Sequence, residues 1–181
     1  MSSRKDSTLA ALLKEKPKRG RPPSAISRQN VYVALTTEQK EWLNQLANDL
    51  PGGFSRADIP DFAVTLLAMR LELLQTAVSD RNRGIPEGIT DLDSLYLLWD
   101  LTLPVADEEN YRWTSIRLSP QQVIELGRVH GILNALFGVN RSQVFALGLA
   151  LFASFSKQQQ LGNHTFKSLR ELRDWIRNIY L

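Results

Sequence analysis

The stretch TSIRLSPQQ at positions 114–122 decides the fold. Its first five residues alternate in character, with Thr114, Ile116 and Leu118 on one face, which is the two-residue period of a β-strand. The next four residues have the composition of a helix start. The stretch therefore predicts a short strand that turns almost directly into a helix.

The predicted helix carries its own start and stop signals. Ser119 and Gln122 have the spacing of a capping box, and Pro120 holds the favoured first helical position. Gly138 ends the helix, and Asn140 then caps a second helix in GVNRSQV. This second helix is apolar on almost every side, so we expect it to be buried from several directions.

The same order of elements occurs upstream, in VYVAL at 31–35 and GFSRADI at 53–59. The strands and first helices of the two copies align at an offset of 83 residues, which matches Leu35 with Leu118. The second helices align at an offset of 85, since the turn of the downstream copy is two residues longer. Any two capped strand–helix–helix units align in part by chance, but here the caps, the breaker and an arginine all fall in step, which favours an internal duplication.

One copy cannot fold alone. A strand of five or six residues has no partner within its own copy, and its backbone N–H and C=O groups would be left unpaired. We therefore expect the two strands to pair antiparallel above intertwined helices. The pairing joins either the two copies of one chain, as a pseudo-dimer, or two chains, which gives a homodimer or higher oligomer with two ribbons.

These segments resemble the ribbon-helix-helix family of DNA-binding proteins, over about residues 30–74 and 111–156. The carrying feature is a strand, a capped helix and the pattern G-x-[S/N]-R-x-x-[I/V] at the start of the second helix. The resemblance implies a mainly α fold with two tandem copies, each of one short strand and two helices. In this family the paired strands form a ribbon that enters the major groove of DNA, and the start of the second helix clamps the DNA backbone.

The period of the strands assigns the candidate base contacts. If Ile116 and Leu118 face the core, then Trp113, Ser115 and Arg117 face outward, and a slip of one residue would invert this assignment. Arg117 suits a bidentate contact with guanine O6 and N7. The alternative is that Arg117 is an exposed strand arginine without a ligand.

The first copy departs from this pattern. Its outward positions are Asn30, Tyr32 and Ala34, with Ala34 in the place of Arg117. Asn30 suits adenine, whereas Ala34 offers only an apolar contact. The first copy is therefore expected to be either a weaker reader of DNA or a mainly structural partner of the second.

The start of each second helix is the candidate phosphate site, because it presents unpaired backbone N–H groups and the positive end of the helix dipole. The candidate contacts are Asn140, Arg141 and Ser142 in the second copy and Ser55 and Arg56 in the first. In the first copy, Pro60 is expected to disturb the opening turns, and Asp58 and Asp61 place negative charge close to where phosphate should bind.

Charge divides the chain into unequal parts. Residues 1–28 and 110–181 each carry a net charge of +6, and acidic sequence lies between them. The predicted organisation is a disordered basic tail (1–28), a first copy (29–74), an acidic connector with a short helix (75–109), a second copy (110–156) and an extra C-terminal amphipathic helix (157–181). Two basic blocks suggest a polyanionic partner, although solubility alone would also explain them.

Within the tail, Arg19, Gly20, Arg21 and Pro22 resemble an AT-hook, a segment that lies in the narrow minor groove of A·T-rich DNA. The alternative is a solubilising or nonspecific tail. In both cases the cations of the tail would strengthen DNA binding by counterion release.

Composition argues against several other classes of function. The chain has no cysteine and two histidines, which removes thiolate metal sites and leaves no material for a His-rich site. No nucleophile–base pair or phosphate loop is recognisable, so we expect neither an enzyme nor a cofactor or small-molecule ligand. The longest apolar run has 12 residues, where a membrane span needs about 20, and no signal peptide is recognisable, so a cytoplasmic, nucleoid-associated protein is expected.

The leading prediction is a sequence-selective protein that binds double-stranded DNA and regulates transcription. The family resemblance equally permits a plasmid relaxosome or partition accessory, or the DNA-binding part of an antitoxin. The alternative from a different class is a protein-interaction adaptor, whose basic tail binds acidic proteins.

Overall fold

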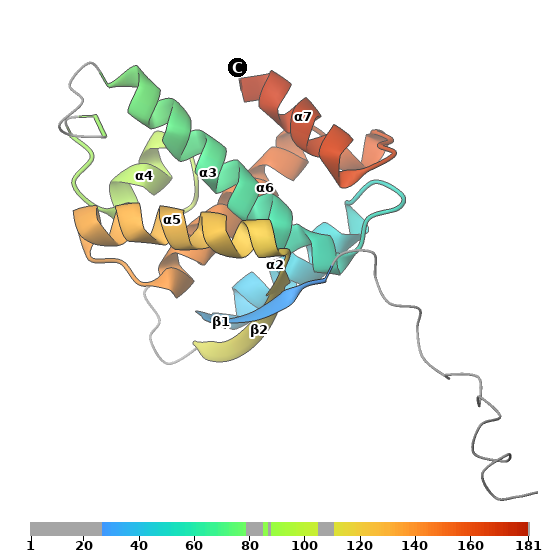
Figure 1. Ribbon diagram of the computed structural model, residues 1–181, viewed down its shortest axis with the longest axis horizontal. Coiled ribbons are helices and arrows are strands. Elements are labelled where there is room, and N and C mark those ends of the chain that lie inside the picture. Colours follow the sequence, from blue (N-terminus) through green and yellow to red (C-terminus); the bar gives the residue numbers. More distant parts are fainter. Residues whose placement is uncertain (1–26, 79–84, 87, 105–110, 181) are drawn as a thin grey trace, which may run out of the picture.

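A computed structural model describes residues 27–78, 85–86, 88–104 and 111–180 of the chain (Figure 1). This part is mainly helical and contains one two-stranded antiparallel sheet. Its elements are β1 (Gln29–Leu35), α2 (Thr37–Asn48), the 3-10 turn η1 (Arg56–Asp58), α3 (Ile59–Ala77), α4 (Leu92–Leu98), β2 (Arg112–Leu118), α5 (Pro120–Phe137), α6 (Arg141–Gln158), the 3-10 turn η3 (Leu161–Asn163) and α7 (Leu169–Tyr180). The AT-hook-like residues of the tail, Arg19, Gly20, Arg21 and Pro22, lie outside the described residues.

The strands β1 and β2 pair with each other within the one chain. Tyr32 lies opposite Ser115 at the centre of the antiparallel register. The predicted phase is the observed one, because Val33, Leu35 and Leu118 are fully enclosed by the helices. Both strands begin two residues earlier than their alternation predicted. The first two residues of each strand pair with the last two residues of the other strand, as Gln29 does with Leu118 and Arg112 with Leu35.

The two strand–helix junctions are capped in different ways. After β1 the predicted capping box is present: the Gln39 N–H donates to Thr36 Oγ1 (3.2 Å), and the Thr36 N–H donates to Gln39 Oε1 (3.0 Å). After β2 the predicted box of Ser119 and Gln122 is wrong. The Ser119 N–H donates instead to the carboxylate of Asp61 in α3 (2.9 Å), because a charged acceptor binds an N–H more strongly than an amide oxygen does.

The helices α3 and α6 cross at the centre of the molecule (Figure 1). At the crossing, Gly148 of α6 meets Ala63 of α3 so closely that a Cβ on Gly148 would lie 2.9 Å from the Ala63 carbonyl oxygen. Glycine at this position therefore sets the spacing of the two central helices. The two residues are 85 positions apart, the offset at which the second helices of the two copies align.

The packing exchanges partners between the two halves of the chain. Helix α3 packs more extensively against α5 than against α2, although α2 comes directly before it in the sequence. Helix α2 in turn packs against α6. The aromatic centre is shared in the same way, since Phe62 of α3 stacks on Phe152 of α6 with 5.5 Å between the ring centroids. Neither half therefore has a complete core of its own.

The acidic connector contributes the predicted short helix, α4, which docks on the core. Asp91 caps it by accepting hydrogen bonds from the backbone N–H and the hydroxyl of Ser94, which lower the pKa of the Asp91 carboxyl. Tyr96 is buried, and this burial raises the pKa of its hydroxyl. The guanidinium of Arg70 lies 5.6 Å from the centroid of the Trp99 ring, which ties α4 to α3.

The C-terminal segment docks on the core, but not as one helix from residue 157. Helix α6 continues to Gln158, and α7 begins only at Leu169. The hydroxyl of Ser168 accepts from the Glu171 N–H (3.2 Å), which fixes the later start. The apolar face of α7 is buried through Leu172 and Ile176.

Among the described residues, no single helix has the length and apolar character to cross a membrane. Helices α5 and α6 meet that criterion only when taken together, and the chain bends by 110° between them.

The close crossing of α3 and α6 gives a prediction on stability. Replacing Gly148 by alanine is expected to lower the free energy of unfolding by about 1–3 kcal/mol, because the new methyl group forces the central helices apart. Gly127→Ala is the control, since Gly127 lies in the exposed middle of α5 with nothing within 4 Å of an added Cβ. Its substitution should be neutral or stabilise by up to about 1 kcal/mol. Urea denaturation measures both variants, and equal effects would contradict the role of Gly148.

Candidate nucleic-acid interface

The outer face of the β1–β2 sheet is a small, solvent-exposed surface at one end of the molecule (Figure 1). It carries the predicted base contacts Asn30, Tyr32, Trp113, Ser115 and Arg117, together with Ala34. Tyr32 is 66% exposed and Trp113 is 75% exposed, although large aromatic side chains are usually well buried. The outward assignment predicted from the alternation is therefore the observed one.

The side chains of this surface, here called the ribbon face, are arranged in three cross-strand pairs. Tyr32 lies opposite Ser115, Asn30 lies opposite Arg117, and Ala34 lies opposite Trp113. Directly opposed residues have Cβ atoms about 4.5–5.5 Å apart, so the two side chains of each pair can contact neighbouring groups of the same ligand. Among the described residues, the guanidinium of Arg117 has no hydrogen-bond or ion-pair partner.

The start of α6 lies beside this surface. Asn140 caps the helix through a reciprocal box, in which its side-chain oxygen accepts from the Gln143 N–H (3.0 Å). Ser142 Oγ accepts from the backbone N–H of Ala34 (2.8 Å), which fixes the helix start to β1. Arg141 between them is exposed. The hydroxyl proton of Ser142 and the side chain of Arg141 thus remain as donors for an anion at the positive end of the helix.

The equivalent start in the first copy has a different geometry. Its opening turn is the 3-10 turn η1, as expected from Pro60, which lacks an N–H and would clash with the carbonyl four residues earlier in an α-helix. The backbone N–H and the hydroxyl of Ser55 both donate to the carboxylate of Asp58, at 2.8 and 2.9 Å. Arg56 is exposed. The predicted phosphate contact Ser55 therefore has its donors engaged by an internal anion.

Arg28 neutralises the two carboxylates at this point. Its side chain is 7% exposed and forms ion pairs with Asp58 and, at 3.5 Å, with Asp61. Arg28, which the sequence pattern assigned to the basic tail, is thus held by ion pairs against the start of α3. Arg28 is one of eight basic residues in positions 1–28, so no local sequence pattern distinguishes it from the other seven.

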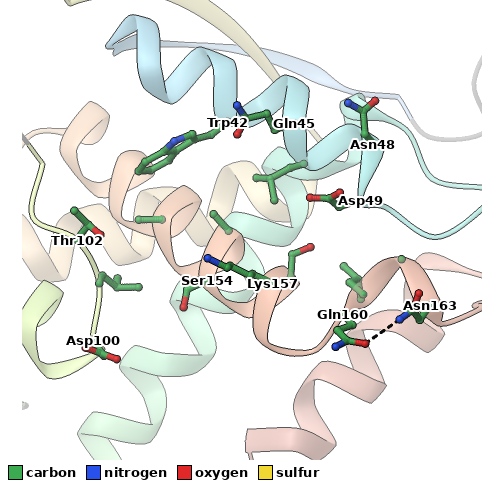
Figure 2. Close-up of a pocket in the computed structure, with 17 residues that line it drawn as sticks. Trp42, Gln45, Asn48, Asp49, Asp100, Thr102, Ser154, Lys157, Gln160 and Asn163 are labelled. Atoms are coloured by element: carbon green, nitrogen blue, oxygen red, sulfur yellow. Dashed lines mark hydrogen bonds between the residues drawn. The ribbon is translucent and has the colours of Figure 1, made fainter.

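A groove of about 790 Å³ lies away from the ribbon face, between α2, α6 and η3 (Figure 2). Trp42 and Gln45 line one wall and Lys157 the other, and Gln160 and Asn163 are hydrogen-bonded at one end. The groove takes no residue from either strand or from the start of α6. Within the described ranges, no three histidine or acidic side chains come together as a candidate metal site.

Comparison of the chain with family models, with curated proteins and with solved structures found no match.

The ion pairs of Arg28 with Asp58 and Asp61 give a second prediction on stability. Asp61→Ala is expected to lower the free energy of unfolding by about 3 kcal/mol, because it leaves the Ser119 N–H buried without an acceptor and weakens the pairing of Arg28. Asp174→Ala is the matched control, since Asp174 is exposed and 4.0 Å from Arg170. This control should leave stability nearly unchanged. Equal stability of the two variants in chemical denaturation would contradict a stabilising role for the contacts of Asp61 with Ser119 and Arg28.

Proposed function

We propose that the chain is a sequence-selective protein that binds double-stranded DNA through the ribbon face and acts as a transcriptional regulator. The observation that carries this proposal is the ribbon face itself: a two-stranded sheet, packed on helices by one side, whose other side exposes hydrogen-bonding and aromatic side chains. The major groove of B-DNA is about 12 Å wide and admits a two-stranded β-ribbon. The side chains that would meet base edges there are Arg117, Asn30, Ser115, Tyr32 and Trp113.

Two meeting points support a tandem ribbon-helix-helix arrangement in a single chain. Tyr32 and Ser115 lie opposite each other and are 83 residues apart, the offset at which the strands align. Ala63 and Gly148 meet at the helix crossing and are 85 residues apart, the offset at which the second helices align. Residues on a two-fold axis meet their own equivalents. The two points therefore agree with one approximate two-fold axis that relates the copies as a built-in pseudo-dimer.

The start of α6 supplies the proposed phosphate clamp. Asn140, Arg141 and Ser142 hold the positive end of an 18-residue helix next to the ribbon face. Phosphate contacts of this kind fix the position of a protein on the duplex, while base contacts carry the sequence information. The basic tail that precedes β1 is proposed to add a minor-groove contact through Arg19 and Arg21.

The alternative roles are outcomes of the same experiments. A role in a plasmid relaxosome, in plasmid partition or in an antitoxin would use the same DNA contacts. It would differ from transcriptional regulation in where the bound DNA sequence lies. The hypothesis of an adaptor that binds acidic proteins accounts for the basic tail, but it does not explain why Arg117 and Asn30 face outward from the sheet.

The role of Arg117 is tested by its removal. Arg117→Ala is expected to weaken binding to a selected duplex by about 1–3 kcal/mol, which is roughly 5- to 150-fold, and to leave binding to unrelated DNA almost unchanged. Arg170→Ala removes the same charge from α7, at the far end of the molecule, and should change neither affinity (Figure 1). Fluorescence anisotropy at fixed salt measures the affinities of the unaltered chain and of both variants for both duplexes. An absence of sequence preference in the unaltered chain would favour the adaptor.

The phosphate clamp is tested by salt dependence. Arg141→Ala is expected to weaken specific and nonspecific binding alike and to reduce the slope of log affinity against log salt by about 0.9, because one phosphate contact is lost. Arg56→Ala is the matched control at the equivalent position, where Asp58 opposes a phosphate. Its slope should change less, and equal changes would show that both helix starts clamp the backbone.

A further inference from the structure

The ribbon face is chemically different at its two ends, and this difference has a consequence for the DNA. We propose, resting on the proposed function, that the chain recognises a non-palindromic site in a single orientation. Sequence is read mainly in the half of the site beneath the Asn30–Arg117 pair. The other half is held mainly through phosphates.

The reading end combines two side chains that recognise purines. Asn30 and Arg117 are directly opposed across the strands and both are exposed. Asparagine suits adenine N6 and N7, and arginine suits guanine O6 and N7. The side chains of an opposed pair can reach adjacent base pairs, because their Cβ atoms are about 5 Å apart. This end therefore favours a half-site with neighbouring adenine and guanine contacts.

The other end offers almost no hydrogen-bonding readout. Ala34 lies opposite Trp113, and these two side chains provide mainly apolar contacts, such as those to thymine methyl groups. The phosphate donors gather at this end instead, because Ser142 is hydrogen-bonded to the Ala34 backbone and Arg141 precedes it. Phosphate contacts hold the duplex without selecting its sequence.

The anion-binding groups are reduced at the reading end. There the helix start is a 3-10 turn, and the carboxylate of Asp58 takes the donors of Ser55. The chain also enters the fold at this end: Gln29 lies opposite Leu118, and Arg28 is fixed by Asp58, Asp61 and the carbonyl of Arg117.

These differences set the orientation of the chain on DNA. Reversal of the chain on the DNA would place Ala34 and Trp113 over the half-site that offers the adenine and guanine contacts. The hydrogen bonds of Arg117 and Asn30 to these bases would then be lost. One good bidentate contact is worth roughly 5- to 150-fold in affinity, so one orientation should dominate by at least about fivefold. A symmetric pair of ribbon strands would show no such preference.

The experiment selects duplexes from random DNA with the full chain and then maps orientation by tethered cleavage. The chain has no cysteine, so one introduced cysteine carries one cleavage reagent. Glu38→Cys and Gln121→Cys are matched positions: both are exposed, both lie in the first turn of a first helix, and they are 83 residues apart. Glu38 follows the Ala34 end of β1, and Gln121 follows the Arg117 end of β2.

The proposal predicts a one-sided consensus. The reagent at position 121 should cut on the flank of the informative half, and the reagent at position 38 should cut on the opposite flank. A palindromic consensus, or cleavage on both flanks from each position, would overturn the inference and leave the proposed function standing. If the selection enriches no sequence, both this inference and the proposed function are contradicted.

A charge-neutral exchange adds a second readout. Ala34→Arg combined with Arg117→Ala moves the guanidinium to the other end of the ribbon face and keeps the net charge. The reagent at position 121 should then cut on the flank away from the guanine-containing half of a newly selected site. Unchanged cleavage relative to that half would contradict a ribbon that sets orientation.

Discussion

The structure depends on the pairing of β1 with β2. Within the described residues these strands form a sheet of two, so each strand satisfies its ladder only through the other. A sheet of two strands is marginal in water unless one face is buried. Val33, Leu35 and Leu118 bury that face against helices from both halves of the chain. The same pairing that stabilises the strands leaves their other face as an exposed ribbon.

The helices that follow the two turns, α3 and α6, begin in different ways. Helix α6 begins with Asn140 as its cap and Arg141 as its first residue, whereas α3 is preceded by a 3-10 turn that ends at Asp58. The carboxylate of Asp61 pairs with Arg28 and accepts a hydrogen bond from the Ser119 N–H, which directly follows β2. These contacts connect the start of α3 to the C-terminal end of β2. One end of the ribbon face is thus reinforced from within, and the other remains available for an anion.

The sequence predicted what local patterns specify. Alternation gave the strands and their facing, the Thr36 box marked the start of α2, and Gly138 ended α5. Contacts between residues far apart in the chain had no such signal. The capping of Ser119 by Asp61 spans 58 residues and displaced a locally plausible box, and Arg28 was indistinguishable from a solvated tail. The end-to-end polarity of the ribbon face required the register, which no single strand contains.

The central claim is that this one ribbon, formed within a single chain, is the surface that meets the bases. Amide chemical-shift mapping of the isotope-labelled chain with a selected duplex tests it most directly. We expect the largest shifts in residues 29–35 and 112–118 and at the start of α6, with α7 and the groove between α2 and α6 nearly unaffected. Specific binding that leaves the amides of both strands unshifted would contradict the account.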